Sequence, residues 1–229
     1  TGIPASPGIG VGPIHVIVAE EYAVKDFAIP ADRVEAEIAF FEKALEASRR
    51  DLAQIRHGIA AELGEHEAGI YDAQMMMVDD PELRRAVHES IRGRRNAGVS
   101  FRDHMAAVAA RLERIEDEYL RERRSDVLDI KRRVLRHLMG DGHKGLSVLE
   151  RPAVVVAHEI GPSDVALLDR ERVLGFVAEV GGRTSHSALV ARGRGIPAVV
   201  GVRGVMQSVK SGDLVIKLDG WRDVEQRKE

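Results

Sequence analysis

The stretch that decides the fold of this chain is residues 174–192, LGFVAEVGGRTSHSALVAR. It opens with an apolar run typical of a buried strand, and its second half has apolar residues at helical spacing. Between the two, Gly181 and Gly182 permit a sharp turn. A strand, a turn and a helix in direct succession form the repeating unit of α/β proteins. Similar Val- and Ile-rich runs predict further strands at 11–18, 153–157, 198–200 and 214–218, with short helices at 163–169 and 184–193.

The middle of the chain has a different pattern. Apolar residues recur at helical spacing over 34–55, 70–78, 81–91, 100–119 and 125–138. Asp79-Asp80-Pro81 has the composition of a helix start. We expect about four amphipathic helices joined by short turns, which make a four-helix bundle.

This alternation predicts an α/β domain with a helical insertion. The expected divisions are 1–30 for the N-terminal strands of the α/β part, 31–142 for the helical bundle, and 143–229 for the rest of the α/β part. The simplest arrangement pairs the N-terminal strand with the C-terminal sheet.

The composition excludes several functions. The 34 basic and 37 acidic residues leave a formal net charge of −3, which gives no general drive toward nucleic acid or an anionic membrane. No apolar run approaches the roughly 20 residues that span a bilayer, and the first residues lack the features of a signal peptide. The chain has no cysteine, so disulfides and thiolate chemistry are excluded and a cytoplasmic location is expected.

His186 is the candidate catalytic residue. In the predicted helix it falls in the first turn, where unpaired backbone N–H groups favour negative charge and disfavour an imidazolium. A neutral, nucleophilic ring there suits a phosphoryl group. The supporting residues that we predict are Gly182 for the turn, Thr184 as helix cap, Ser185 and Ser187 as hydroxyl donors, and Arg183 and Arg192 as cationic donors. The alternative is an inert histidine near a helix start.

The order of these residues resembles the phosphohistidine signature of phosphoenolpyruvate-utilising enzymes. Residues 195–201, GIPAVVG, continue that resemblance. Within this family, three other segments resemble Enzyme I of the bacterial phosphotransferase system: GIPASPG at 2–8, MMVDDPEL at 76–83, and the helical region around 117–130. The resemblance covers essentially the whole chain.

The resemblance implies a swivelling α/β phosphohistidine domain with an inserted four-helix bundle. In that family the histidine takes a phosphoryl group from phosphoenolpyruvate, which binds with magnesium in a C-terminal domain, and donates it to the carrier protein HPr. For this chain it implies His186 as the phosphoryl acceptor, no cofactor of its own, HPr and a C-terminal domain as partners, and a monomer when isolated.

The resemblance also implies that HPr docks on the first two helices of the insertion. The candidate docking residues are the acidic and apolar residues of the second helix: Glu65, Glu67, Tyr71, Asp72, Met75 and Met76. Acidic residues there suit a basic carrier. The alternatives are that the methionines fill a core and that the acids are ordinary exposed helix charges.

Two positions depart from the family pattern. Gly161 stands where a threonine hydroxyl commonly contacts the histidine ring, so ring orientation is expected to rest on a backbone carbonyl or on Ser163. Glu67 lies near a position where Enzyme I often has a lysine. Both departures are compatible with a divergent branch, such as a nitrogen-type system.

Two rival functions remain open. One is the phosphohistidine domain of a pyruvate phosphate dikinase or phosphoenolpyruvate synthase, and the other is a non-enzymatic binding module. His158-Glu159 lacks the second histidine of a zinc protease motif, so no metal site is predicted.

Overall fold

The computed structural model describes residues 2–17, 24–116, 118–140, 149, 151–161, 164, 169, 171–183 and 185–215, without the side chains of 118–122, 186 and 215. The chain divides into two compact units, one formed by Thr1–Glu20 with Gly145–Glu229 and the other by Glu21–Lys144. None of the described helices combines the length and the apolar composition needed to cross a bilayer.

The first unit is built on a mixed sheet. Its strand order is β1-β5-β4-β3-β2-β6. The described strands are β1 (Ile3–Ser6), β2 (Gly12–Ile17), β3 (Ala153–Ala157), β4 (Val173–Ala178), β5 (Ala198–Val200) and β6 (Leu214–Val215). Strands β2, β3, β4 and β5 run parallel, whereas β1 is antiparallel to β5 and β6 is antiparallel to β2. The predicted pairing of the N-terminal strand at 11–18 with the C-terminal sheet is therefore confirmed by β2 and β3, and β1 adds a strand that was not predicted.

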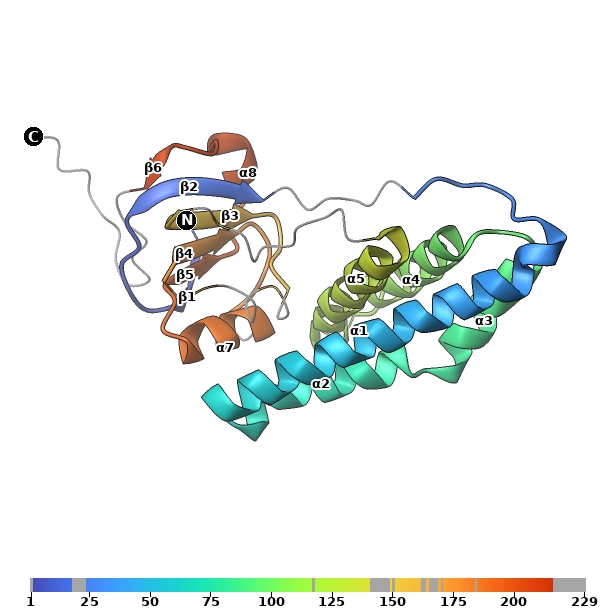
Figure 1. Cartoon of the computed structure of the whole chain (residues 1–229). Coiled ribbons are helices and arrows are strands. Elements are labelled where there is room, and N and C mark those ends of the chain that lie inside the picture. The colour runs from blue at the N-terminus through green and yellow to red at the C-terminus, as the bar shows by residue number, and fades with distance from the viewer. Residues whose placement is uncertain are drawn as a thin grey trace, which may run out of the picture. The chain divides into compact units, whose positions relative to one another are not determined.

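Side chains of alternating strand residues pack on one face of this sheet. Ile14, Val154, Val156 and Val177 form a buried apolar cluster. Val205 and Met206 of the short helix α8 (Val205–Ser208) pack against it. Helix α7 (His186–Gly193) lies beside β1 and β5 (Figure 1). The sheet core therefore fixes the strand ends from which the loops of the candidate site depart.

The second unit contains five described α-helices rather than four. They are α1 (Val34–Leu63), α2 (Glu65–Val78), α3 (Pro81–Arg92), α4 (Ala97–Glu113) and α5 (Glu118–Met139), preceded by a 3₁₀ turn at Ala31–Arg33. The predicted helix over 100–119 is wrong at its end, because α4 stops at Glu113 and residue 119 belongs to α5. The predicted start at Pro81 is confirmed, with the side chain of Asp80 capping the helix by accepting from Glu82 N.

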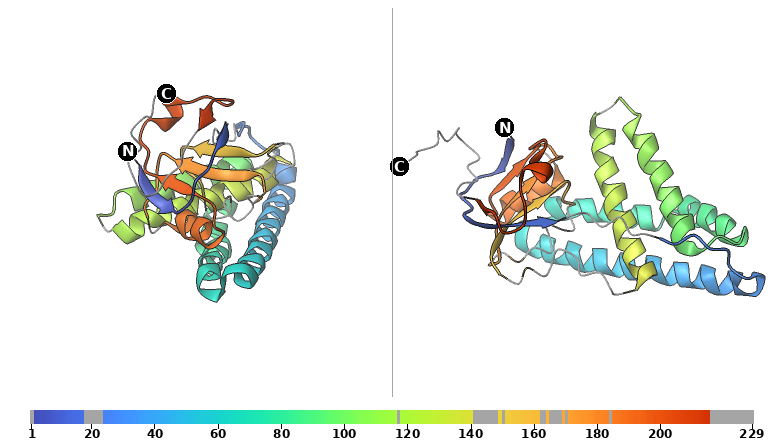
Figure 2. Two further views of the ribbon diagram at one scale, coloured as in Figure 1. Left: turned by 90° about the vertical axis from the view of Figure 1, so that its left-hand side faces the viewer. Right: turned by 90° about the horizontal axis from the view of Figure 1, so that it is seen from above.

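Four of these helices pack as two antiparallel pairs, and α3 packs against α4 and α1. In the right-hand view of Figure 2, α1 and α2 run side by side, and α4 and α5 form a second pair that crosses them. Helix α1 contributes the longest apolar stripe, at the spacing expected of one helix face: Ile38, Phe41, Leu45, Leu52 and Ile59 are buried. Phe41 also contacts Phe101 of α4, with ring centroids 5.8 Å apart.

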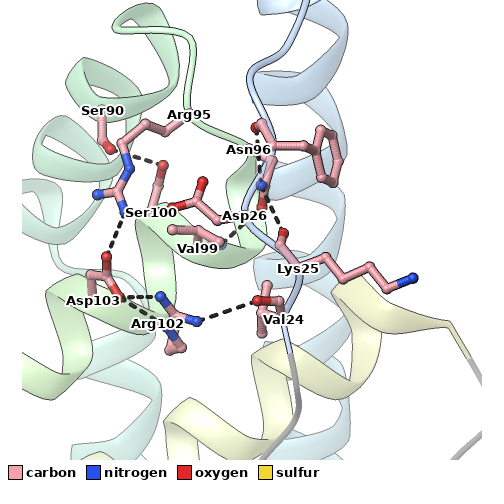
Figure 3. A network of polar contacts seen from close by, with 11 residues as sticks. Val24, Lys25, Asp26, Ser90, Arg95, Asn96, Val99, Ser100, Arg102 and Asp103 are labelled. Carbon is pink, nitrogen blue, oxygen red and sulfur yellow. Dashed lines mark hydrogen bonds and ion pairs between the residues drawn. The ribbon is translucent and has the colours of Figure 1, made fainter.

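Residues 24–29 belong to this helical unit rather than to the sheet. The amide nitrogen of Asn96 donates to the carbonyls of Lys25 and Phe27, while its oxygen caps α4 by accepting from Val99 N (Figure 3). Arg102 donates to the carbonyl of Val24. The extended segment is thus held by its backbone, a mode of attachment that hydrophobic periodicity does not reveal.

A buried polar cluster joins α2 and α5. Asp126 is fully buried and accepts from Arg123 Nη1 at 3.1 Å. Burial raises the pKa of Asp126 to about 6, against the hydrogen bond from Arg123, which lowers it. Gln74 of α2 is also fully buried, next to Asp126, yet neither atom of its amide makes a hydrogen bond of good geometry.

Candidate functional site

The candidate acceptor, His186, is the first residue of α7. The prediction that it falls in the first turn of a helix is confirmed, although its side chain lies outside the described residues. The turn before it contains Gly181, the third residue after β4, which has a φ of +130°. An added Cβ there would be strained by that φ and would lie 3.4 Å from the Cβ of Val200. Glycine at 181 therefore permits the sharp approach from the sheet to the helix.

Ser185, rather than Thr184, caps α7. Its hydroxyl oxygen accepts from Ala188 N at 3.4 Å and lies 3.2 Å from the hydroxyl of Ser187. Ser187 is 9% exposed. Thr184 lies outside the described residues. The two serine hydroxyls thus have partners within the helix start, and their predicted role as donors to a phosphoryl group stays a prediction.

Arg192 has a structural role that the motif did not indicate. Its Nε and Nη2 atoms donate to the carbonyl of Ala5 at 3.2 and 2.8 Å, and Nη2 also reaches the carbonyl of Arg183 at 3.3 Å. One guanidinium thereby joins α7, β1 and the turn before His186. Arg183 itself is exposed, so of the two predicted cationic donors it is the one whose side chain faces solvent.

A carboxylate–imidazole pair at the same edge of the sheet was missed by sequence reasoning. His158 follows β3 and Glu179 follows β4, and the His158 Nδ1 to Glu179 Oε2 distance is 2.7 Å. The hydrogen bond from His158 holds the pKa of Glu179 below its usual value. The sequence could have revealed this pair, because each residue lies at the end of a predicted strand and parallel strands that are neighbours in a sheet end at the same edge.

The position that departs from the family threonine is buried. Gly161 donates its backbone N–H to the side chain of Asp164 at 3.2 Å. Ser163, the predicted substitute for the threonine hydroxyl, lies outside the described residues.

The predicted docking residues on α2 do not share one surface. Tyr71 is completely buried, so its assignment to a docking surface is wrong, whereas Met76 is 75% exposed and Met75 is half-buried. Glu65 and Asp72 each form an ion pair with Arg56 of α1, at 2.7 and 2.8 Å. This pairing offsets part of the acidic charge expected there. Glu67 is half-buried.

The described residues contain no group of three or more His, Asp or Glu side chains placed to hold a metal ion.

Comparison with known proteins identifies the class. Residues 1–123 match the family model described as PEP-utilising enzyme, N-terminal, and residues 149–222 match the one described as PEP-utilising enzyme, mobile domain. The chain belongs to this family of phosphoenolpyruvate-utilising enzymes.

Within the family, the chain is similar to Enzyme I. Proteins named phosphoenolpyruvate-protein phosphotransferase from Listeria monocytogenes and Staphylococcus aureus are 40% and 36% identical to it over 220 residues. These alignments cover 96% of this chain but 38% of each relative, so the chain spans less than two-fifths of their length.

Two solved structures have the same fold. A solution structure of Enzyme I is 40% identical, with a TM-score of 0.69, over 96% of this chain and 88% of that one. The N-terminal domain of a nitrogen Enzyme 1 is 23% identical, with a TM-score of 0.66, over 94% of this chain and 92% of that one. The sequence-based resemblance to Enzyme I is confirmed.

Proposed function

We propose that this chain is a phosphoryl carrier that accepts a phosphoryl group on the imidazole of His186. The observation that carries the proposal is the position of His186, at the first residue of an eight-residue helix directly after a glycine turn at the end of a parallel strand. Backbone N–H groups at a helix start favour an anion and a neutral imidazole. The family membership supports the same chemistry.

Transfer between His186 and an HPr-type carrier exchanges one P–N bond for another, whereas uptake from phosphoenolpyruvate breaks a P–O bond and releases the enolate. When the carrier is the donor, a lone pair on one ring nitrogen of His186 forms the new P–N bond, while the bond from phosphorus to the carrier's imidazole breaks. The donor ring leaves neutral when its second nitrogen carries a proton, and the second nitrogen of His186 keeps its own proton, so charge balances. Such a transfer depends on alignment and charge stabilisation more than on acid–base catalysis.

The exposed guanidinium of Arg183 is the proposed donor to the phosphoryl oxygens. The bonds of Arg192 to the carbonyls of Ala5 and Arg183 suit it better to holding the turn. Ser185 and Ser187 would have to exchange their present partners to bind the phosphoryl group, and we propose them as secondary donors.

Phosphoenolpyruvate is the proposed source of the phosphoryl group and an HPr-type carrier its proposed destination. The relatives named phosphoenolpyruvate-protein phosphotransferase support this assignment. Binding of phosphoenolpyruvate, and the magnesium that the family uses, would belong to a C-terminal domain of the whole protein. We propose a cytoplasmic location and a monomeric state for this chain, with a swivelling motion of the α/β unit during transfer.

For the helical unit we propose carrier docking, centred on the exposed side chain of Met76 with Met75, Glu65, Glu67 and Asp72 nearby in sequence. A mobile apolar side chain flanked by acids suits a carrier that presents an apolar patch with basic residues.

The experiment is incubation of the chain with a phosphorylated HPr-type carrier, followed by measurement of acid-labile phosphate on the chain. Wild type should take up close to one phosphate per chain, and the matched His186→Ala variant should take up none. Label on the variant equal to that on wild type would contradict the assignment of His186.

The same assay separates the rivals. A dikinase or synthase domain would be labelled through a partner that uses ATP and not by phosphorylated HPr. A binding module would carry no acid-labile phosphate with any donor. The names of the relatives favour the first proposal over both.

A further inference from the structure

The turn that carries the acceptor leaves the sheet beside the pair formed by His158 and Glu179. The strand pairing between β3 and β4 continues through these residues, since Glu179 N donates to Ala157 O at 3.1 Å and Val180 N donates to His158 O at 2.9 Å. Glu179, two positions before Gly181 and seven before His186, thus lies within an extension of β4 that reaches Val180.

The carboxylate of Glu179 connects three segments. Its Oε2 atom accepts from His158 Nδ1 at 2.7 Å, and its Oε1 atom accepts from the backbone of Met206 in α8 at 3.4 Å. When the Gln207 amide is oriented to satisfy both of its polar atoms, it also donates to Oε1, at 3.2 Å. The side chain of Glu179 is 11% exposed, whereas that of His158 is 60% exposed.

The charge of the Glu179 carboxylate suits the acceptance of these hydrogen bonds. The hydrogen bond from His158, more than any other contact, holds the pKa of Glu179 below its usual value, and the N–H groups at the start of α8 act in the same direction. The carboxylate is therefore ionised at neutral pH and accepts from every partner at once.

The segment after Glu179 depends on such an anchor. Only three residues, 180–182, separate it from Arg183, whose carbonyl is held by Arg192. Two of these three are glycines, and glycine has the greatest backbone freedom of any residue. A glycine turn keeps a fixed path only when both of its ends are fixed. Here the carboxylate of Glu179, together with the backbone bond from Val180 N to His158 O, fixes one end, and Arg192 fixes the other.

We propose that Glu179, held in place by His158, is a positioning residue for phosphoryl transfer at His186. The inference rests on the proposed function. Neither residue touches the phosphoryl group in this account, and both act by fixing the path of the turn between β4 and α7.

The test measures the rate of phosphoryl uptake from a phosphorylated HPr-type carrier as a function of carrier concentration. His158→Ala should lower the maximal rate about tenfold and leave the KM for the carrier unchanged, because misalignment by a fraction of an ångström slows transfer without altering docking. His158→Asn should restore most of the rate, since an asparagine Nδ2 replaces the Nδ1 donor. His158→Gln should not, because its donor lies too far along the side chain.

The matched control is Glu82→Gln, which removes another carboxylate with a lowered pKa, in an exposed ion pair with Arg85 on α3. It should leave the rate unchanged. Equal rates for wild type, His158→Ala and Glu179→Gln would overturn the inference while leaving the proposed function intact. A wild type that takes up no phosphate would instead overturn the proposed function, and the inference with it.

Discussion

The acceptor turn, residues 181–186, is proposed to receive the phosphoryl group, and helix α2 is proposed to dock the carrier. Their residues are arranged in different ways along the sequence. In the turn, residues adjacent in sequence serve one purpose, from Gly181 through Ser185 to His186. On α2, neighbours point in different directions, so that Tyr71 is fully buried while Met76, five residues on, is 75% exposed. A contiguous motif therefore points to the proposed acceptor, whereas only the helical period separates core from surface on α2.

The largest expected effect tests the core side of this comparison. Tyr71→Ala should lower the free energy of unfolding by about 3–5 kcal/mol, because it empties a large site in the packed interior of the helical unit. Urea unfolding followed by circular dichroism measures it. A loss below about 1 kcal/mol would return Tyr71 to the candidate docking surface.

The second effect tests the buried polar cluster behind α2. The pKa of Asp126 is about 6 in the folded chain and near 3.8 when unfolded, so the folded state binds the proton more tightly. This group's contribution to stability is full below about pH 4 and is lost as pH rises through 6, a change on the order of 2–3 kcal/mol. The groups that face it are Arg123, Asp129 and Gln74.

Asp126→Asn should remove that pH dependence. Relative to wild type, the variant should gain stability as pH rises from 4 to 7. Chemical unfolding of both proteins at several pH values gives the difference. A difference that stays constant from pH 4 to 7 would mean that Asp126 is already ionised in the folded chain at the lower pH.

The third effect tests how Arg192 holds the turn before His186. Arg192→Lys keeps the charge but loses the planar fork that reaches the carbonyls of Ala5 and Arg183. We expect a loss of about 1–2 kcal/mol of stability and faster amide exchange at residues 183–186. If phosphate uptake falls while stability and exchange stay at wild-type levels, Arg192 is instead a phosphate ligand.

The smallest effect on stability is expected at the exposed face of α2. Met76→Ser should change the free energy of unfolding by less than about 0.5 kcal/mol, since the side chain makes few buried contacts. Under the proposed function it should nevertheless weaken binding of the carrier several-fold, measured by calorimetry. Unchanged affinity would remove Met76 from the docking surface.

Sequence patterns were sufficient to place most of the elements whose structure is local, though not every helix end or cap. The strands at 153–157 and 198–200 and the place of His186 in the first turn of a helix follow from apolar runs and glycines in adjacent residues. They were insufficient where the deciding partner is distant in sequence. Arg192 bonds to Ala5, and Asn96 bonds to Lys25, across 187 and 71 residues.

The wrong assignment of Tyr71 has a different cause. Its core stripe on α2 includes Ala68, Gln74 and Val78, and the glutamine within it obscures the apolar pattern. A buried glutamine has no signature in hydrophobic periodicity, because its burial is set by facing groups such as Asp126.

The most direct measurement maps the phosphate after exposure of the chain to a phosphorylated HPr-type carrier. Trypsin cleaves after Arg183 and Arg192, releasing the peptide TSHSALVAR, residues 184–192, whose only histidine is His186. Mass spectrometry under alkaline conditions should find the added phosphoryl group on that peptide and on its histidine. Phosphate on the peptide that contains His158, or on serine, would contradict the account.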